Sequence, residues 1–252
     1  MPADARSHVL DIPIDDISLD EAVRRSEAML RDGGFHQVVT PGPEFILESL
    51  HHPAFKRALQ ESDLAIPDGI GLKVGSFLRG PRIRHRVAGV DFVHALMRLA
   101  AREGYSVFFL GAKTGVGERA YQTLHKEFPQ LKLAGTDPMQ RGWWGRLSDA
   151  RVLERIHLAK PDILLVALGF PRQELWIHQH REALHDVRLA VGLGRTLDYF
   201  AGDIKRPSKF LRHFGFEWLG TFFGAKHYHQ AALRRRRIWN AIWHYPWTIL
   251  TK

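Results

Sequence analysis

The first two hundred residues alternate short apolar runs with stretches in which apolar residues recur at helical spacing. Each apolar run has the length of one buried strand, and each stretch between two runs can hold a helix. Strands separated by helices form βαβ units, which build a mostly parallel sheet with helices on both faces. The pattern therefore predicts a Rossmann-like α/β fold. The predicted strands cover 37–40, 64–66, 106–110, 131–134, 162–168 and 188–191.

Helical patterns occupy the segments between these strands. One begins at Ser18 with Glu21 three residues on, a capping box in which both side chains satisfy free backbone N–H groups. No internal repeat, low-complexity segment or long polar linker interrupts the pattern before residue 203. We therefore predict an α/β domain over 1–202 and an appendage over 203–252. The other helices are predicted at 90–102, 115–128, 149–159 and 172–184.

The appendage differs from the rest of the chain in both pattern and charge. Strand-like runs disappear, and 207–245 has the pattern of two or more helices rich in aromatic residues. Of the formal net charge of +9, most belongs here: residues 203–252 contain ten Lys or Arg and two acids, whereas the first 202 contain 26 basic and 25 acidic residues. Arginines among Trp and Phe predict an anchor on an anionic membrane surface. A solvated basic face with Trp packed inward is the alternative.

Composition excludes several kinds of chemistry. The 252 residues contain no Cys, so there is no disulfide, zinc–thiolate site or Cys nucleophile, which fits a reducing cytoplasm. No uncharged apolar run is long enough to span a membrane, and the first residues lack a signal-peptide pattern. There is no Gly-x-Ser-x-Gly motif of serine hydrolases and no Asp-x-Asp pair for a divalent ion. The closely spaced histidines at 178/180 and 227/229 would not share a helix face, so we expect no metal site.

Ligands of an open parallel sheet bind at the carboxyl ends of its strands, where loops lead into helices. Two predicted strands end in distinctive polar residues. The first runs into Thr40 and a proline-set turn, and the second places Asp68 before Gly69 and Gly71. Asp68 alone could also be an ordinary helix N-cap.

Two further strand ends carry glycine and polar residues. The loop with Gly111 and Gly115 follows a hydrophobic strand and opens a helix, an arrangement that presents backbone N–H groups to phosphate. A tight turn would require the same glycines. The last junction combines Gly169 with Gln173 and Glu174 in the first turn of a helix. Four such junctions in one sheet favour a shared ligand site.

These motifs occur in the order typical of one family of enzymes. The chain resembles the WecG/TagA/CpsF glycosyltransferases over about residues 10–220. The resemblance implies a sugar transfer from a UDP-sugar to a polyprenyl-diphosphate-linked sugar at the cytoplasmic membrane face, with no metal or other cofactor. It rests on Thr40-Pro41-x-Pro43-Glu44, Pro67-Asp68-Gly69-Ile70-Gly71, Arg86-Val87-x-Gly89-x-Asp91, Leu110-Gly111-(x)3-Gly115-Val116, Gly169-x-Pro171-x-Gln173-Glu174-x-Trp176, Asp198-Tyr199-Phe200-Ala201-Gly202, Lys205-Arg206-Pro207 and Glu217-Trp218-Leu219.

The resemblance also implies roles for individual residues. Asp68 would be the general base that deprotonates the acceptor hydroxyl. Thr40 would lie near a reacting sugar, and Arg86 and Gln173 would face the donor, with Arg86 as a counter-charge for leaving UDP. Trp143 would stack on uracil. The other residues expected to bind the donor are Gly111, Gly115, Gly169, Glu174, Gly194 and Asp198.

Two departures from the family pattern bear on the donor. Gly42 stands where most members have Asn, and the segment Gly194-Arg195-Thr196-Leu197-Asp198-Tyr199 replaces a Gly-Gly-x-Phe-Asp-Phe pattern. Both could alter which sugar is accepted. N-acetylmannosamine, its uronic acid and glucose therefore stay open as the transferred sugar, and self-association into a homo-oligomer is also left open.

Two other classes of function were weighed. A nicotinamide-dependent oxidoreductase would use a similar sheet, but no Gly-x-Gly-x-x-Gly follows a strand with an acidic residue about 20 positions on. A nucleic-acid binder could use the basic appendage, but the balanced first 202 residues offer no extended phosphate footprint. We therefore expect no nucleic acid among the partners.

Overall fold

The computed structural model describes residues 6–78, 82–138, 146–204 and 245–251 of the chain. Its centre is a sheet of six parallel strands in the order β4-β3-β8-β7-β5-β6. All six predicted strands are confirmed, with ends that differ by at most three residues, and the fold is Rossmann-like. The strands are β3 (His36–Val39), β4 (Leu64–Ala65), β5 (Ser106–Gly111), β6 (Lys132–Asp137), β7 (Ile163–Ala167) and β8 (Leu189–Gly192).

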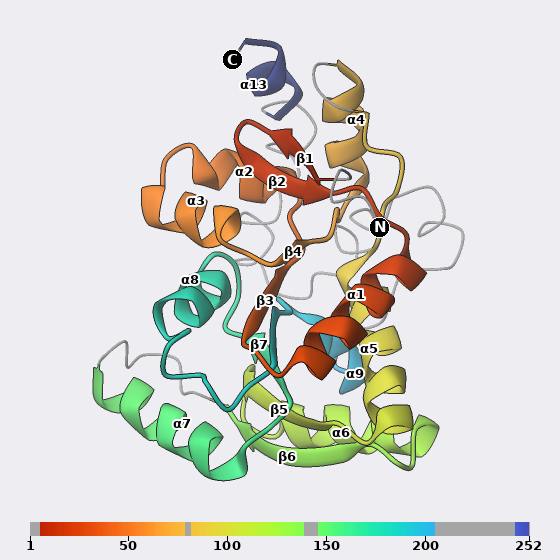
Figure 1. Ribbon diagram of the computed structural model, residues 1–252, viewed down its shortest axis with the longest axis vertical. Coiled ribbons are helices and arrows are strands. Elements are labelled where there is room, and N and C mark those ends of the chain that lie inside the picture. The colour runs from red at the N-terminus through yellow and green to blue at the C-terminus, as the bar shows by residue number, and fades with distance from the viewer. Residues whose placement is uncertain (1–5, 79–81, 139–145, 205–244, 252) are drawn as a thin grey trace.

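The central strands are buried on both faces, which explains their continuous apolar sequences. Successive residues of a strand point to opposite faces, so in β5 Val107 and Phe109 pack into one hydrophobic cluster and Phe108 and Leu110 into another. The helices form the outer layers of this arrangement (Figure 1). One face is covered by α1 (Leu19–Asp32), α5 (Gly89–Glu103), α6 (Val116–Glu127) and α9 (Thr196–Phe200), and the other by α2 (Pro43–Ser49), α3 (Pro53–Gln60), α7 (Arg146–Ala159) and α8 (Arg172–Gln179).

Helix α1 shows half of the predicted capping box. The Oγ of Ser18 accepts a hydrogen bond from the backbone N–H of Glu21 at 3.3 Å. The carboxylate of Glu21 pairs with Arg24 and Arg25 on the next turn instead of returning to Ser18. The expected reciprocal bond is therefore replaced by helix-surface ion pairs.

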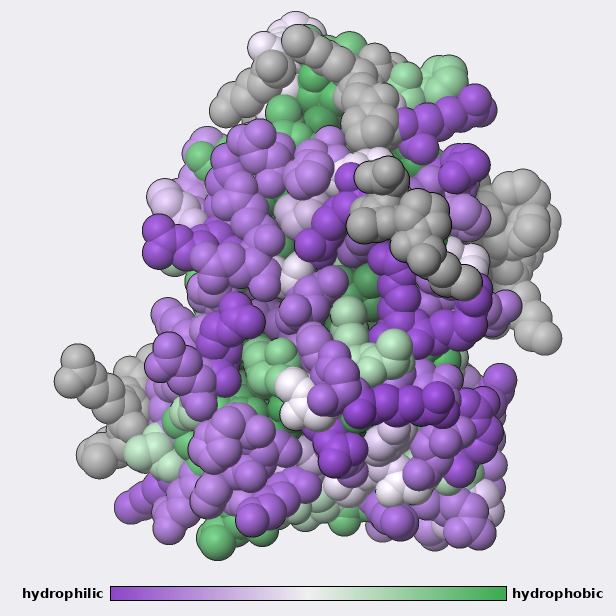
Figure 2. Space-filling model, viewed as in Figure 1, coloured by the Kyte–Doolittle hydropathy of each residue, from purple (hydrophilic) through white to green (hydrophobic). Residues whose placement is uncertain are grey.

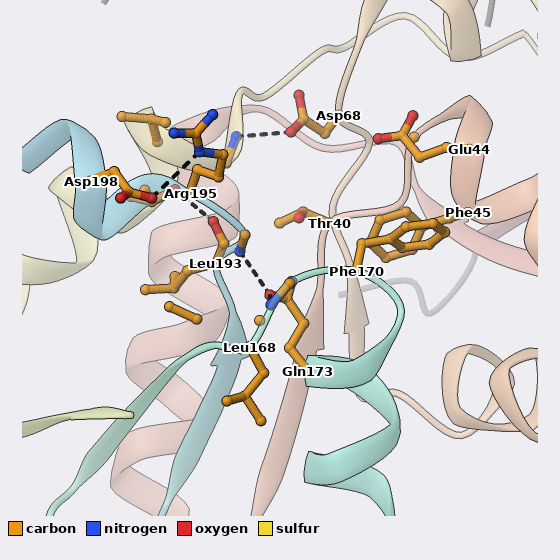
Figure 3. Close-up of a pocket in the computed structure, with 18 of the residues that line it drawn as sticks. Thr40, Glu44, Phe45, Asp68, Leu168, Phe170, Gln173, Leu193, Arg195 and Asp198 are labelled. Atoms are coloured by element: carbon orange, nitrogen blue, oxygen red, sulfur yellow. Dashed lines mark hydrogen bonds and ion pairs between the residues drawn. The ribbon is translucent and has the colours of Figure 1, made fainter. Parts of the chain in front are cut away.

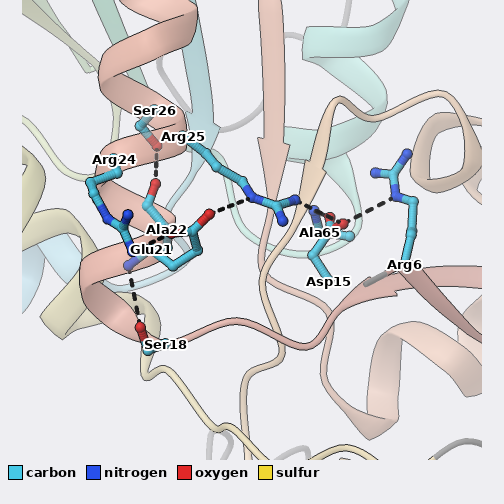
Figure 4. Close-up of polar contacts among 9 residues, drawn as sticks. All are labelled: Arg6, Asp15, Ser18, Glu21, Ala22, Arg24, Arg25, Ser26 and Ala65. Carbon is cyan, nitrogen blue, oxygen red and sulfur yellow. Dashed lines mark hydrogen bonds and ion pairs between the residues drawn. The ribbon is translucent and has the colours of Figure 1, made fainter. Parts of the chain in front are cut away.

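An antiparallel hairpin of β1 (Arg6–Val9) and β2 (Ile12–Asp15) precedes α1 and was not predicted. Its turn residues, Leu10 and Asp11, have positive φ but are neither Gly nor Asn, so the turn carries no typical hairpin signal. Asp15 fastens the hairpin to the edge of the main sheet. Its side chain is buried, and its Oδ2 accepts a hydrogen bond from the backbone N–H of Ala65 in β4 at 2.7 Å. Arg6 and Arg25 approach its other oxygen at 3.5 and 3.6 Å (Figure 4). One carboxylate thus joins the hairpin, β4 and α1.

Two helices lie together at one end of the molecule, α4 (Ile70–Leu78) and the C-terminal α13 (Tyr245–Thr251) (Figure 1). The Tyr245 side chain is fully buried, with its ring over Gly75 of α4. The remainder of the predicted helical appendage, residues 205–244, lies outside the described residues. Within the described parts of the chain, no helix has both the length and the apolarity needed to cross a bilayer.

Candidate active site

A pocket of about 690 Å³ lies at the carboxyl ends of β3, β4, β5, β7 and β8. From β3 the chain continues to β4 at one edge of the sheet, whereas β5 and β6 lie toward the opposite edge. The connections therefore diverge above the centre of the sheet. Such a divergence leaves a crevice for ligands in open α/β sheets. Three of the four predicted strand-end junctions contribute Thr40, Asp68, Gly69, Gly169 and Gln173 to its lining, whereas Gly71 and Glu174 of the same junctions do not line it. The fourth junction contributes the residues between its glycines.

Thr40 and Asp68 meet on one side of this pocket. Both line it, at the ends of β3 and β4. The Asp68 Oδ2 accepts a hydrogen bond at 3.3 Å from the backbone N–H of Gly89, the first residue of α5. A Cβ built on Gly89 would lie 3.4 Å from that oxygen and 3.7 Å from the Thr40 Oγ1, so the hydroxyl and the carboxylate converge on this helix end (Figure 3). The positive end of the helix dipole stabilises negative charge there.

Gln173 connects two loops on the other side of the pocket. Its Oε1 accepts hydrogen bonds from the backbone N–H groups of Gly169, after β7, at 3.2 Å and of Gly194, after β8, at 2.9 Å. Its Nε2 donates to Glu174 at 2.7 Å. Gly169, Gln173 and Gly194, three of the predicted donor-binding residues, line the pocket, and their contact with a donor stays a prediction.

Glu174 lies beneath this connection and does not line the pocket. It is completely buried, and its Oε2 has no hydrogen-bond partner among the described residues. Burial raises the pKa of the Glu174 carboxyl from 4.5 to about 7; the hydrogen bond from Gln173 opposes this in part, and the charge of Glu44 adds to it. At neutral pH this carboxyl therefore exchanges readily between its neutral and ionised forms.

The backbone conformation explains why glycine occupies the two positions predicted to bind phosphate. Gly111 has a φ of +95°, and a Cβ there would lie 2.7 Å from the backbone of Ala167 in the neighbouring strand. Gly115 has a φ of +80° at the N-cap of α6. Neither lines the pocket, although Ala112 and Lys113 between them do. The turn interpretation thus accounts for both glycines, and contact with a donor phosphate stays a prediction.

Charged side chains line the side nearest β8 and the loop after β5. Asp198, a predicted donor-binding residue, pairs with Arg195 at 3.5 Å, and Lys113 and Arg172 also line the pocket. Arg86 is half-buried and does not line the pocket, although Ala88, two positions further on, does. Trp143 lies outside the described residues.

The sequence analysis missed an aromatic wall of the pocket. The rings of Phe45, from α2, and Phe170, after β7, lie 4.7 Å apart and both line the pocket (Figure 3). Phe55 of α3 supports them, with ring separations of 5.5 and 5.4 Å. Phe170 lies inside a motif noted for its glycine and proline, and Phe45 directly follows another, but the motifs gave no sign that the two rings would meet.

One group of side chains in the described residues could hold a metal ion, and it lies away from this pocket. His157 of α7, His185 and Asp186 bring their ligand atoms within 4.8 Å of one another. His185 and Asp186 precede β8, so they lie at the amino edge of the sheet, opposite the pocket. The group therefore takes no part in the site at the strand ends.

The fold and the pocket define a Rossmann-like enzyme whose polar, charged and aromatic groups meet at the carboxyl ends of the strands. The sequence matches the glycosyl transferase WecG/TagA/CpsF family over residues 7–224. It is also 35% identical over 183 residues to the N-acetylglucosaminyldiphosphoundecaprenol N-acetyl-beta-D-mannosaminyltransferase of Bacillus spizizenii, a match that covers 72% of this chain and 68% of the relative. The protein of the same description from Staphylococcus aureus is 28% identical over 217 residues, which cover 85% and 83% of the two chains. The chain belongs to the WecG/TagA/CpsF family and is a glycosyltransferase.

Proposed function

We propose that the enzyme transfers a hexosyl unit from a UDP-sugar to a sugar carried on a polyprenyl diphosphate, in the synthesis of a bacterial surface polysaccharide. The observation that carries the proposal is that Thr40 and Asp68 converge on the start of α5 inside the pocket. The chain belongs to a family of glycosyltransferases, which gives this arrangement its proposed chemistry. The two relatives described above, whose names state a prenyl-diphosphate acceptor, support the acceptor class. N-acetylmannosamine is favoured as the transferred sugar for the same reason.

Asp68 is the proposed general base. As the acceptor hydroxyl attacks the anomeric carbon, its proton passes to the Asp68 carboxylate and the bond from that carbon to the UDP oxygen breaks, which inverts the configuration. Thr40 is near enough to hydrogen-bond the reacting hydroxyl or the donor sugar, since both side chains approach Gly89.

The loops after β5, β7 and β8 are the proposed donor side. Lys113, Arg172 and Arg195 provide positive charge along the lining, which can stabilise the diphosphate that leaves as UDP. Arg86 stays a candidate for the same role. Because side-chain cations can supply this charge, we propose that the reaction needs no metal ion, and full activity in EDTA is the expected result.

The decisive experiment compares Asp68→Asn with Glu44→Gln, the neighbouring carboxylate of the lining, and with Asp20→Asn on the exposed start of α1. Sugar transfer and UDP binding are measured separately. We expect Asp68→Asn to abolish transfer while UDP still binds, and Asp20→Asn to behave as the unaltered enzyme. Full transfer by Asp68→Asn together with loss in Glu44→Gln would assign the base to Glu44.

A membrane-facing end is the second part of the proposal. Of the four large apolar side chains strongly exposed in the described residues, three lie on α4 and α13: Phe77, Trp247 and Leu250. Apolar surface is visible at this end of the molecule in Figure 2. An exposed apolar patch suits the interface of a bilayer, and the many Lys and Arg of the 203–252 sequence suit anionic headgroups.

The membrane contact is tested by replacing Phe77, Trp247 and Leu250 together with Ser. Their side chains are mostly in solvent, so the fold should be retained. We expect the variant to bind anionic vesicles more weakly than the unaltered chain, with unchanged transfer to a short-chain, water-soluble acceptor. Equal vesicle binding by the two proteins would place the contact elsewhere, as in the 203–252 appendage outside α13.

A further inference from the structure

Three buried polar side chains form a stack under the donor side of the pocket. Gln173 is the upper member, Glu174 is next to it, and Gln37 of β3 lies below, where its Nε2 donates to the backbone carbonyl of Glu174 at 3.2 Å. The exposed fractions are 3%, 0% and 1%, so water does not compete for these contacts. Buried polar groups of this kind fix a local geometry when they are paired.

The stack determines which way the Gln173 amide faces. An amide has a donor end and an acceptor end, and either could in principle point to the loops. The Oε1 of Glu174 accepts from the Nε2 of Gln173 at 2.7 Å, which leaves the Gln173 Oε1 to face the N–H groups of Gly169 and Gly194. With the amide reversed, two backbone donors would face the amide NH2 group and lose their bonds.

Space beneath Glu174 is fully used. A Cβ on Gly192, the last residue of β8, would lie 2.6 Å from the Glu174 Oε1 and 2.8 Å from the Gln173 Nε2. Only glycine at position 192 therefore leaves room for the carboxyl and the amide side by side.

We infer that Glu174 is a positioning residue for the donor: it fixes the amide of Gln173, which in turn holds the loops after β7 and β8 in the shape that binds the donor. It touches no substrate itself, because it does not line the pocket. The inference rests on the proposed function in one respect, that these loops bind the UDP-sugar.

Ionisation of Glu174 has two opposing effects, because it strengthens the hydrogen bond from Gln173 but leaves a charge in a site without water. The burial cost is the larger of the two, so ionisation should loosen the arrangement. A charged carboxylate in a site without water, with Glu44 on α2 as the nearest like charge, favours opening toward solvent. In the described part of the chain, no Lys, Arg or His forms an ion pair with Glu174. On α8 itself, Arg172 lines the pocket and His178 lies 3.7 Å from Glu61. β7 and β8 carry no titratable side chain, His36 of β3 pairs with Asp32 and Asp63, Lys56 of α3 pairs with Asp11, and Arg57 of α3 acts on His178.

The test measures UDP affinity, donor KM and kcat for Glu174→Gln and Glu174→Leu, with Glu182→Leu as an exposed control from the segment after α8. The glutamine keeps an oxygen that can accept from Gln173, so its donor KM should stay within about twofold of the unaltered enzyme. The leucine has similar volume but no acceptor, so its KM should rise by about tenfold or more with little change in kcat. Glu174→Asp, whose shorter side chain draws the carboxyl away from the amide, should give an intermediate rise.

The pH profile separates positioning from simple packing. In the unaltered enzyme, donor KM should rise as the pH increases through about 7. In Glu174→Gln, donor KM should not rise over the same pH range. A donor KM in a folded Glu174→Leu or Glu174→Asp equal to that of the unaltered enzyme would overturn the inference, as would equal losses in the glutamine and leucine variants. Failure of the proposed function would look different, because the unaltered enzyme itself would then neither bind UDP nor transfer sugar.

Discussion

Helix α13 contacts α4 at a position where only glycine fits, and a single methyl group tests that contact. A Cβ on Gly75 would lie 2.2 Å from one ring carbon of Tyr245 and 2.7 Å from its hydroxyl oxygen. Separations this short are not tolerated, so Gly75→Ala must displace the ring. Because Tyr245 and Ile249 are the buried apolar side chains by which α13 joins the core, the displacement should undock the helix.

Two opposing effects set the magnitude. Alanine in place of glycine inside a helix stabilises by about 0.5–1 kcal/mol. Exposing Tyr245 and Ile249 loses roughly 1.5–3 kcal/mol each, about 3–6 kcal/mol together. The net expectation for Gly75→Ala is a loss of about 2–5 kcal/mol in the free energy of unfolding, measured by urea denaturation followed by circular dichroism.

The sign of the effect should reverse when Tyr245 is absent. In a Tyr245→Ala background the clash has no partner, so adding Gly75→Ala should stabilise by about 0.5–1 kcal/mol. If Gly75→Ala stabilised the otherwise unaltered chain, the docking of Tyr245 on α4 would be refuted.

Three further predictions concern the hairpin and the site. Asp15→Ala removes the acceptor for Ala65 and should lower stability by about 2–3 kcal/mol in urea unfolding; Asp15→Asn can keep that bond and should lose clearly less. Gly192→Ala should cost about 1–3 kcal/mol and weaken UDP binding in calorimetry, since the new methyl group meets Gln173 and Glu174; unchanged affinity and stability would contradict the packing described. Stability should fall by about 3 kcal/mol as pH rises from 4.5 to about 7, because the unfolded chain ionises Glu174 before the folded chain does; Glu174→Gln should lack this slope, and a slope equal to that of the unaltered chain would argue against the raised pKa.

The sheet could be predicted from the sequence because its strands are buried on both faces and separated by helices. The runs around Phe108 and Leu164 are continuous in apolar residues, a signal that does not depend on distant contacts. Helices α2, α3 and α4 were missed because they are short and their proline and glycine positions resemble turns. The hairpin at the start was missed because its turn residues, Leu10 and Asp11, give no typical hairpin signal. Their structure depends on tertiary packing, such as the contact of Asp15 with β4.

The candidate site was predictable to the level of its strand ends but not of its contacts. Parallel strands bring their carboxyl ends to one edge, so Thr40, Asp68 and Gln173 could be expected to share a pocket. The sequence could not show that the Glu174 side chain lies beneath that of Gln173. Where each of two adjacent side chains at a helix start points depends on how the helix packs against the sheet. The pairing of Phe45 with Phe170 joins segments 125 positions apart and leaves no local signal.

The two sides of the pocket come from two separate parts of the sequence. The proposed base and its neighbours come from β3, β4 and the start of α5, all before residue 92, whereas the loops after β5, β7 and β8 come from residues 111–204. The two groups meet where β3 pairs with β8. A crossover between relatives in the α5–β5 connection, near Gly104, would therefore exchange the proposed donor side as one continuous block and leave the residues proposed to activate the acceptor in their own context. New pairings of donor and acceptor could then arise by recombination of two segments, without coordinated changes scattered through the gene.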